Sequence, residues 1–278
     1  MLIWFYRREA IIDRQIVRSV NRMRIVDIRV VTAAVVLLAG TPGHAMVGEA
    51  ETMADARSRP EVMILGSGGT FCSGVAIAPN LVLTAAHCVM PGVTYKRVEL
   101  DENGKPTLKD SLAVAQHPQF DIKSLFAHRA TADFGLIKLK EPMAATPVPL
   151  ALPRQRIAPG ETFIVHGYGR SVRGDRNSAA TLRAAHLIAT GHPGSLQLRL
   201  IDPATADKRP GLGGCTGDSG APVYQEHAGR LALIGVVSWA AGPNNTDGCG
   251  GLTGVTPIEI YRAWIVETAR KLGVRLAD

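Results

Sequence analysis

Hydrophobic positions in this chain come in short runs, many of them alternating with polar residues and separated by Gly, Pro or Asn. The clearest runs are 62–65, 75–78, 81–84, 95–100, 112–116, 136–139, 162–166, 182–189, 196–200, 222–225 and 231–238. Short apolar or alternating runs bounded by turn-forming residues are typical of β-strands. A long succession of them predicts an all-β barrel or sandwich.

Residues 258–272 follow a helical rather than a strand period. The apolar stripe consists of Tyr261, Trp264, Ile265, Thr268 and Leu272. Residues three and four apart share one face of a helix, so this spacing predicts an α-helix with a single apolar face. Pro257 suits the start of that helix and Gly273 suits its end. We expect the helix to pack on the second half of the chain.

The first 45 residues are typical of a secretory signal. Arg24 and Arg29 form a basic flank, residues 30–40 are apolar, and small residues precede a cut after Ala45. An uncleaved membrane anchor is the alternative, although the apolar run is too short to span a bilayer comfortably. Met23 begins a signal of ordinary length, so residues 1–22 could be a mis-assigned start. The predicted location is secreted or periplasmic, with no stable membrane association after cleavage.

Length and composition allow one or two domains, because 278 residues that are 46% hydrophobic can bury a sizeable core. Residues 147–159 are rich in proline and lie near the middle of the chain that follows the leader. They are the best candidate for a linker. We therefore predict a leader at 1–45 and two β-domains at 46–150 and 151–278, with the helix in the second domain.

The positive charge of the chain is concentrated in the leader. Formal net charge is +7, and residues 1–45 hold seven arginines against three acidic residues. The remaining charge of about +3 is too small and too scattered for a nucleic-acid footprint. We expect no nucleic-acid partner.

The chain has four cysteines, Cys72, Cys88, Cys215 and Cys249. An even number of cysteines in an exported chain favours disulfides. Three pairings are possible, and the pairing Cys72–Cys88 with Cys215–Cys249 keeps each bridge within one half of the chain. A zinc site is the competing interpretation, but no Cys-x-x-Cys or His-x-x-x-His spacing supports it. We predict no metal and no cofactor.

Two segments hold a histidine and a serine in surroundings that suit catalysis. They read Thr-Ala-Ala-His-Cys at 84–88 and Gly-Asp-Ser-Gly-Ala-Pro at 217–222. A serine hydroxyl attacks a peptide carbonyl only when a base removes its proton, and histidine can do so and then protonate the leaving amine. Ser219 is therefore the candidate nucleophile and His87 the candidate base.

The mechanism also needs a buried carboxylate to hold the histidine ring in the right tautomer. Asp133 leads into the apolar run 134–139, so its carboxylate would be partly buried and would need a partner such as an imidazole. Asp121 is the rival, but its neighbours read as an exposed loop. We favour Asp133.

These segments together resemble the chymotrypsin family of serine endopeptidases, in its secreted bacterial form. The histidine box, Asp-Phe-Gly-Leu-Ile at 133–137 and the serine loop follow the family's order, and the similarity covers about residues 46–272. Weaker marks are His-Pro-Gln-Phe at 117–120, Gly-Tyr-Gly at 167–169 and Ser-Trp at 238–239. The resemblance implies an all-β fold of two six-stranded antiparallel β-barrels with a C-terminal α-helix.

The resemblance also assigns roles around the nucleophile. It implies that the backbone N–H groups of Gly217 and Ser219 stabilise the oxyanion that forms during attack. It further implies that a Cys72–Cys88 disulfide braces His87, and that a Cys215–Cys249 disulfide pins the wall of the specificity pocket.

Many members of this family are activated when a new N-terminal ammonium group is buried against the acid before the serine, which is Asp218 here. A cut after Ala45 would free Met46, followed by Val-Gly-Glu, and this resembles the family's activated start. Our hypothesis is that signal cleavage itself creates the Met46–Asp218 pair. Pairing raises the pKa of the ammonium group, so the pair would be lost as pH climbs through that pKa.

The resemblance places a set of residues around the side chain that precedes the cleaved bond. They are Gly213, Gly214, Ser238, Trp239, Ala240, Thr253 and Gly254, with the last two as alternatives for one wall. A trypsin-like enzyme would have an aspartate at position 213 to hold Lys or Arg. The glycine there predicts small or medium apolar side chains instead.

The sequence leaves two alternative functions. A non-catalytic homologue would bind proteins through the same cleft, but such proteins commonly lose a catalytic residue and none is lost here. An esterase of the α/β-hydrolase type would need Gly-x-Ser-x-Gly and the order Ser, Asp, His, and the chain has neither. We predict a monomeric serine endopeptidase that acts on protein or peptide substrates.

Overall fold

The computed structural model describes residues 46–54, 58–101, 103, 105–150, 157–191, 196–227 and 229–276. The predicted leader at 1–45 lies outside the described residues, and so does the middle of the predicted linker, at 151–156. The predicted domain boundary therefore stays a prediction.

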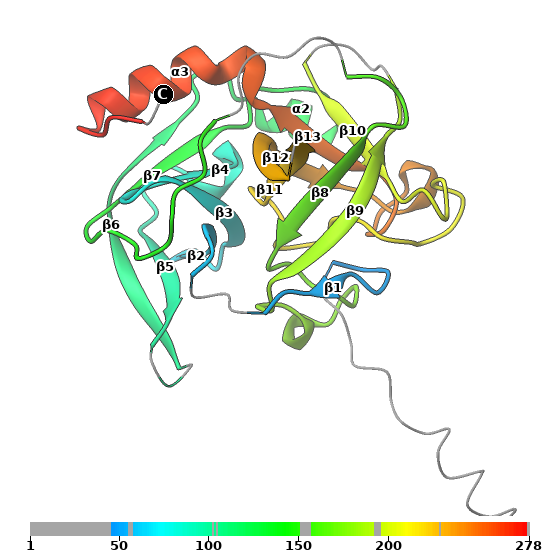
Figure 1. The fold of residues 1–278 in the computed structure, drawn as a ribbon, viewed down its shortest axis with the longest axis horizontal. Coiled ribbons are helices and arrows are strands. Elements are labelled where there is room, and N and C mark those ends of the chain that lie inside the picture. Colours follow the sequence, from blue (N-terminus) through cyan, green and yellow to red (C-terminus); the bar gives the residue numbers. More distant parts are fainter. Residues whose placement is uncertain are drawn as a thin grey trace, which may run out of the picture. The chain divides into compact units, whose positions relative to one another are not determined.

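Six antiparallel strands form a first closed barrel, in the order β2-β3-β4-β7-β6-β5 (Figure 1). The strands are β2 (Glu61–Gly66), β3 (Phe71–Ala78), β4 (Leu81–Thr84), β5 (Tyr95–Leu100), β6 (Pro106–Gln116) and β7 (Gly135–Leu139). A short helix, α2 (Ile122–Phe126), lies in the connection between β6 and β7. This barrel carries the histidine and aspartate segments.

A second barrel follows. Its strands are β8 (Thr162–Gly167), β9 (Arg183–Ala189), β10 (Leu198–Ile201), β11 (Pro222–His227), β12 (Arg230–Ala240) and β13 (Thr253–Pro257). They pair in the order β9-β10-β13-β12-β11-β8, and a β8–β9 pairing closes the ring. Strand β1 (Glu51–Thr52) adds to the outside of β9. The predicted fold class, two six-stranded antiparallel barrels with a C-terminal helix, is confirmed.

Strands β4 and β7 are buried on both faces, which explains their continuous apolar runs. Val82 and Ile137 belong to one core cluster with residues of β2 and β5. Their neighbours Leu81, Leu83 and Leu136 belong to another, which includes residues of the C-terminal helix and of the second barrel. Alternate residues of a strand point to opposite faces, so each strand contributes to both clusters.

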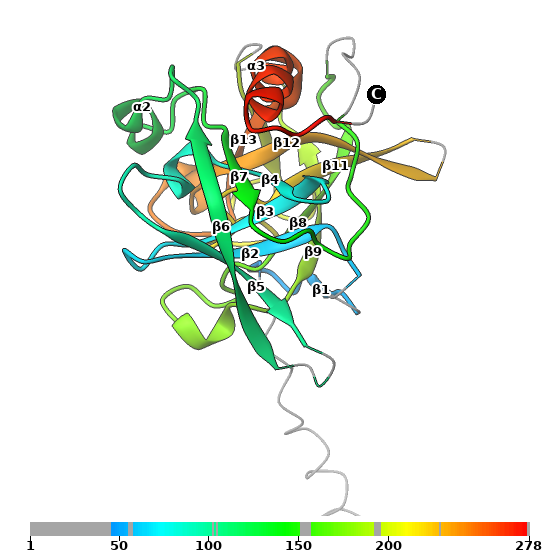
Figure 2. The ribbon, with the colours of Figure 1, turned by 90° about the vertical axis from the view of Figure 1, so that its left-hand side faces the viewer.

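The C-terminal helix α3 (Ile258–Lys271) begins directly after β13. Its buried residues Tyr261 and Ile265 pack with Phe134 and Leu136 of the first barrel as well as with Leu233 of the second. Figures 1 and 2 both show α3 lying along the first barrel beside β7. The helix packs on the second half of the chain as expected, through β12, and its apolar stripe also covers part of the first barrel.

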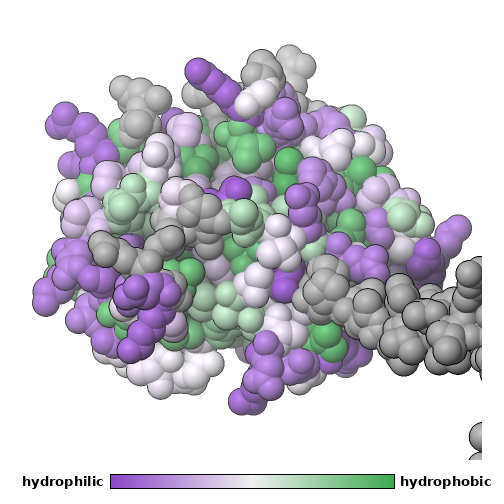
Figure 3. All heavy atoms as spheres, turned by 60° about the horizontal axis from the view of Figure 1, so that its bottom comes forward, coloured by the Kyte–Doolittle hydropathy of each residue, from purple (hydrophilic) through white to green (hydrophobic). Residues whose placement is uncertain are grey.

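Hydrophobic residues on the described surface are mixed with hydrophilic ones. On the face shown in Figure 3, hydrophilic residues lie mostly around the margin and hydrophobic residues gather toward the middle. In the part of the chain that the structure describes, no helix is both long and apolar enough to cross a membrane.

Candidate active site

His87 lies in a single 3-10 turn, Ala86–Cys88, that follows the end of β4. A disulfide joins the next residue, Cys88, to Cys72 of β3. The turn is therefore attached to the barrel wall on both sides of the histidine. The imidazole itself is part-exposed, with 18% of its side-chain surface accessible.

Asp133 precedes β7 and is fully buried. Its carboxylate oxygens lie 3.1 and 2.9 Å from Nδ1 of His87, and Oδ1 also accepts the backbone N–H of His87 at 3.1 Å. The hydroxyl of Ser238 donates to Oδ2 at 2.5 Å. A buried carboxylate is costly unless it is hydrogen-bonded, and these contacts satisfy it.

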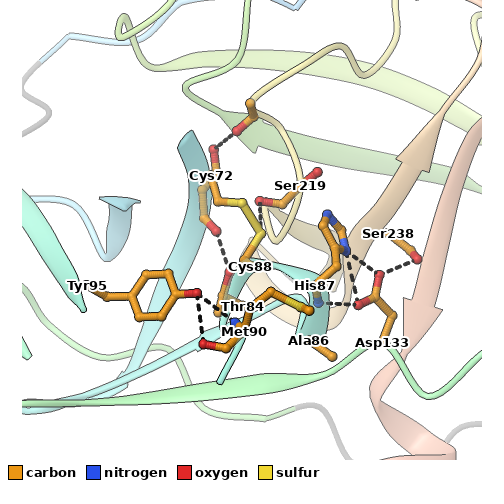
Figure 4. Close-up of a disulfide and its surroundings, with 12 residues drawn as sticks. Cys72, Thr84, Ala86, His87, Cys88, Met90, Tyr95, Asp133, Ser219 and Ser238 are labelled. Atoms are coloured by element: carbon orange, nitrogen blue, oxygen red, sulfur yellow. Dashed lines mark hydrogen bonds and ion pairs between the residues drawn. A yellow bond between two sulfur atoms is a disulfide. The ribbon is translucent and has the colours of Figure 1, made fainter. Parts of the chain in front are cut away.

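These contacts also fix the tautomer of His87. An ionised carboxylate can only accept hydrogen bonds, so the proton of the neutral ring must lie on Nδ1. Nε2 then carries the lone pair on the opposite edge of the ring. Figure 4 shows Asp133 and Ser238 on one side of the His87 ring and the Ser219 side chain directed toward its other side.

Ser219 lies in the turn before β11, on the second barrel. Gly220, with a φ of +78°, lets this turn approach the first barrel, since a Cβ there would lie 2.1 Å from Oγ1 of Thr84 and 2.3 Å from the carbonyl of Ser73. The carbonyl of Ser219 accepts the N–H of Ser73 at 2.8 Å. The structure thus brings Ser219 to the histidine across the seam between the barrels.

No hydrogen bond joins the Ser219 hydroxyl to the His87 ring within the described residues. Catalytic hydrogen bonds are often long or poorly aligned before a substrate binds and tighten only in the complex. The three side chains therefore lie in the order serine, histidine, aspartate, with the serine and the aspartate on opposite sides of the imidazole ring. The aspartate–histidine hydrogen bond is formed, and the serine–histidine hydrogen bond is not.

The predicted oxyanion donors are the backbone N–H groups of Gly217 and Ser219. In the described part of the chain, neither the N–H of Gly217 nor that of Ser219 donates to a protein acceptor. Gly217 has a φ of +101°, and a Cβ there would meet the ring of Phe71 at 2.5 Å. Glycine is required at this position both for the backbone conformation and for the approach to Phe71.

Thr253 lies beside two of the predicted pocket residues, Gly213 and Gly214. Its Oγ1 accepts the N–H of Gly214 at 3.0 Å, and it would lie 3.4 Å from a Cβ on Gly213. A Cβ on Gly214 would also lie 3.3 Å from Ala240. No acidic side chain lies at position 213 or 214.

Gly254 faces away from this pocket and against Trp239. A Cβ on Gly254 would lie 2.2 Å from the indole ring. On another side of the indole, His128 stacks at a centroid distance of 4.4 Å, and the guanidinium carbon of Arg199 lies 5.7 Å from the ring centroid. His128 is held there by a 2.9 Å contact between its Nδ1 and Oδ1 of Asn245.

Met46 and Asp218 are both fully buried. The Asp218 carboxylate accepts the N–H groups of Gly169 at 2.8 Å and Cys215 at 2.9 Å. Burial raises the pKa of Asp218 to about 7, although these N–H groups and the charge of Arg183 act in the opposite direction. Met46 packs in the core of the second barrel, and Val47 pairs with Gly213.

The remaining candidates have structural roles. Asp121 caps α2 by accepting the N–H groups of Lys123 and Ser124 at 3.0 and 3.2 Å, and it lies on the surface. Among the described residues, the one cluster with metal-ligating geometry consists of Cys72, His87 and Cys88. Both sulfurs form the disulfide, so this cluster offers no thiolates for zinc. The second disulfide joins Cys215 to Cys249.

Sequence reasoning missed two hydroxyls at the site. Ser238 was assigned to the specificity pocket, yet its hydroxyl binds Asp133. Ser73 was not singled out, yet it is buried and bonded to the serine loop. Both serines interrupt apolar runs, and a polar residue in such a run must find a buried partner, which is the signal that could have identified them.

Comparisons with known proteins agree with this geometry. The profile of the Trypsin family matches residues 47–265. Kallikrein-15 of Saguinus oedipus is 31% identical over 241 residues, which cover 77% of this chain and 88% of that protein. Trypsin-3 of Salmo salar is 30% identical over 216 residues, which cover 73% of this chain and 85% of that protein.

A solved structure, described as the atomic resolution structure of HBP, shares the fold. It superposes with a TM-score of 0.62 at 21% identity, over 81% of this chain and 97% of that one. Two closed barrels with a histidine, an aspartate and a serine at their seam define a chymotrypsin-fold protein. The family match covers most of the chain, and the chain belongs to the trypsin-like serine protease family.

Proposed function

We propose that this protein is an active, secreted or periplasmic serine endopeptidase, with Ser219 as nucleophile, His87 as base and Asp133 as the carboxylate that orients the base. One observation carries the proposal. The fully buried Asp133 is bonded to Nδ1 of His87, which leaves Nε2 of the same ring free on the side to which Ser219 is directed.

The first chemical step uses that free nitrogen. Nε2 of His87 takes the proton of the Ser219 hydroxyl as Oγ bonds to the carbonyl carbon of the substrate. The resulting imidazolium is stabilised by Asp133, whose charge is itself held by the N–H of His87 and the hydroxyl of Ser238. His87 then donates the proton to the leaving amine, and an acyl group remains on Ser219.

The negative charge that develops on the carbonyl oxygen is stabilised by the backbone N–H groups of Gly217 and Ser219. Donors that already point at the oxyanion need no reorganisation during the reaction, which is why such donors contribute strongly to rate. Water then attacks the acyl group by the same route, with His87 again as base, and releases Ser219.

We propose a preference for small or medium apolar side chains before the cleaved bond, supported by the residues around Gly213 and Gly214. Gly213 and Gly214 bring no charge, while Thr253 and Ala240 limit the width. A charged Lys or Arg side chain would be desolvated there without a carboxylate partner from either glycine. Peptide-library cleavage tests this preference, and a clear preference for Lys or Arg would refute it.

Activation is proposed to follow cleavage after Ala45. The supporting observation is that Met46 is already buried in the second barrel and that Asp218 is a buried carboxylate with two N–H donors but no bonded cation among the described residues. A new ammonium group on Met46 would supply that charge. Mass spectrometry of the exported protein tests the start, and any start other than Met46 contradicts it.

The catalytic assignment is tested by labelling with a sulfonyl fluoride, which requires an assembled nucleophile, base and oxyanion site. We expect one covalent adduct on Ser219 in the mature protein, together with cleavage of peptides. The variants Ser219→Ala and His87→Ala should give neither. A folded wild-type protein without an adduct and without cleavage would instead be a binding protein built on a protease fold.

A further inference from the structure

One buried residue of the first barrel forms hydrogen bonds with two residues of the serine loop. Ser73 lies on β3 with 1% of its surface exposed. Its N–H donates to the carbonyl of Ser219 at 2.8 Å, and its hydroxyl donates to the carbonyl of Gly217 at 2.9 Å. Ser73 thus binds the carbonyls of the two residues whose N–H groups are the predicted oxyanion donors.

The direction of the hydroxyl bond is fixed by a third contact. The N–H of Tyr168, on the second barrel, lies 3.1 Å from Oγ of Ser73. A backbone N–H can only donate, so Oγ accepts from Tyr168 and its single proton is left for the carbonyl of Gly217. Ser73, Gly217 and Tyr168 are all buried, so neither of these two bonds is exchanged for water without cost.

The contact matters because a glycine backbone rotates more freely than that of a residue with a Cβ. The φ of Gly217 is +101°, a conformation that is open to glycine. The peptide group before it is held by the bond from the N–H of Arg170 to the carbonyl of Thr216, at 3.0 Å. The carbonyl after it is held by the Ser73 hydroxyl. With both flanking peptide groups held, the N–H of Gly217 keeps its direction.

We infer that Ser73 is a positioning residue for the oxyanion site, acting through the carbonyl of Gly217. The inference rests on the proposed protease function. It means that a first-barrel side chain, and not only the loop's own sequence, holds the donor that stabilises the transition state. Loss of the Ser73 hydroxyl should therefore weaken binding of the tetrahedral intermediate, which carries the oxyanion, and leave binding of the substrate itself unchanged.

The test compares Ser73→Ala with wild type and with Ser73→Thr, which keeps the hydroxyl. We expect Ser73→Ala to lower kcat about 10- to 100-fold and to leave KM unchanged. This loss of kcat is at most comparable to that caused by removing an oxyanion donor outright. The inhibition constant of a peptide aldehyde, which forms a tetrahedral adduct on Ser219, should rise by the same factor. Ser73→Thr should recover most of both. Melting temperatures establish that every variant is folded at the assay temperature.

The matched control is Ser111→Ala, which removes a hydroxyl bond to the carbonyl of Tyr95 at 2.8 Å, away from the site. It should move the melting temperature but neither kcat nor the aldehyde constant. If Ser73→Ala behaves like this control, the role of Ser73 is only structural and the inference is overturned. If wild type neither cleaves peptides nor binds the aldehyde, the proposed function fails first and the assignment of Ser73 falls with it.

Discussion

At the scale of single residues, the site depends on positions where no larger side chain fits. Gly217 is the sharpest case, because an added Cβ would meet Phe71 at 2.5 Å and the Cα of Gly169 at 3.0 Å. The loop would have to move, and the N–H of Gly217 would move with it. If Gly217 is an oxyanion donor, as proposed, adding a single methyl group here should disturb catalysis.

We predict that Gly217→Ala lowers kcat by about 10²- to 10³-fold, the usual cost of losing one oxyanion donor. Gly69→Ala is the control, since Gly69 also has a positive φ, +81°, but no heavy atom lies within 4 Å of its Cβ position. Steady-state kinetics of both variants measures the difference. Equal losses in the two variants would mean that backbone strain, and not the donor, is responsible.

In the proposed specificity pocket, Thr253 is the residue that would limit the width. We predict that Thr253→Ser, which keeps the bond from Gly214 and removes a methyl group, shifts preference toward an apolar side chain one methylene longer. The expected change in the ratio of kcat/KM values is about 10-fold, since one methylene in such a pocket is worth roughly that or more. This ratio is measured with two peptides that differ by one methylene in the side chain before the cleaved bond. An unchanged ratio would place the substrate side chain elsewhere.

At the scale of elements, a buried polar cluster joins the two barrels. Oε1 of Glu61 on β2 lies 2.7 Å from Nδ1 of His166 on β8 and accepts the hydroxyl of Tyr224 on β11 at 2.9 Å. Burial alone would raise the pKa of Glu61, but the hydrogen bond and charge of His166, with help from Tyr224, hold that pKa below its usual range. The carboxylate is therefore ionised and depends on partners from the other barrel.

We predict that Glu61→Gln lowers the free energy of unfolding by about 3–5 kcal/mol, because removing one partner of a buried pair leaves the other partner buried and uncompensated. The control is Glu141→Gln, which breaks an exposed contact with Lys109 and should cost less than about 1 kcal/mol. Urea denaturation measures both. Similar small losses would show that the cluster contributes no more than a surface pair.

The sequence allows the elements to be predicted better than their contacts. Every apolar run named from the pattern overlaps a strand, and residues 258–272 form α3 almost as expected. β13 was not among those runs, because Thr-Gly-Val-Thr-Pro has a glycine and a proline and follows a glycine-rich stretch. The histidine, aspartate and serine segments were found from local chemistry. Which barrel face α3 covers, and what Ser73 binds, depend on contacts between distant segments.

At the scale of the whole molecule, the state of Asp218 links the N-terminus to stability. Its pKa is raised to about 7 by burial, whereas an unfolded aspartate has a pKa of about 3.9. The folded protein then binds a proton on Asp218 that the unfolded chain has released. The stability that protonated Asp218 contributes is present at low pH and is lost as pH rises from the pKa of the unfolded chain to that of the folded protein.

We predict that a protein starting at Gly43 loses up to about 4 kcal/mol of unfolding free energy between about pH 4 and 7, at about 1.4 kcal/mol per pKa unit. A protein starting at Met46 should lose much less, because its ammonium group pairs with the carboxylate. Denaturation at several pH values compares them, and Asp218→Asn should remove the difference. Parallel curves for the two starts would contradict the pairing.

The placement of α3 has a consequence for synthesis. The helix comes after every barrel strand, yet it covers residues of the first barrel such as Phe134 and Leu136. A growing chain whose early strands have already emerged therefore still exposes that apolar surface to any binding chaperone. This surface can be buried only after residues 258–271 have been synthesised, so the first barrel cannot complete its packing before the helix is available.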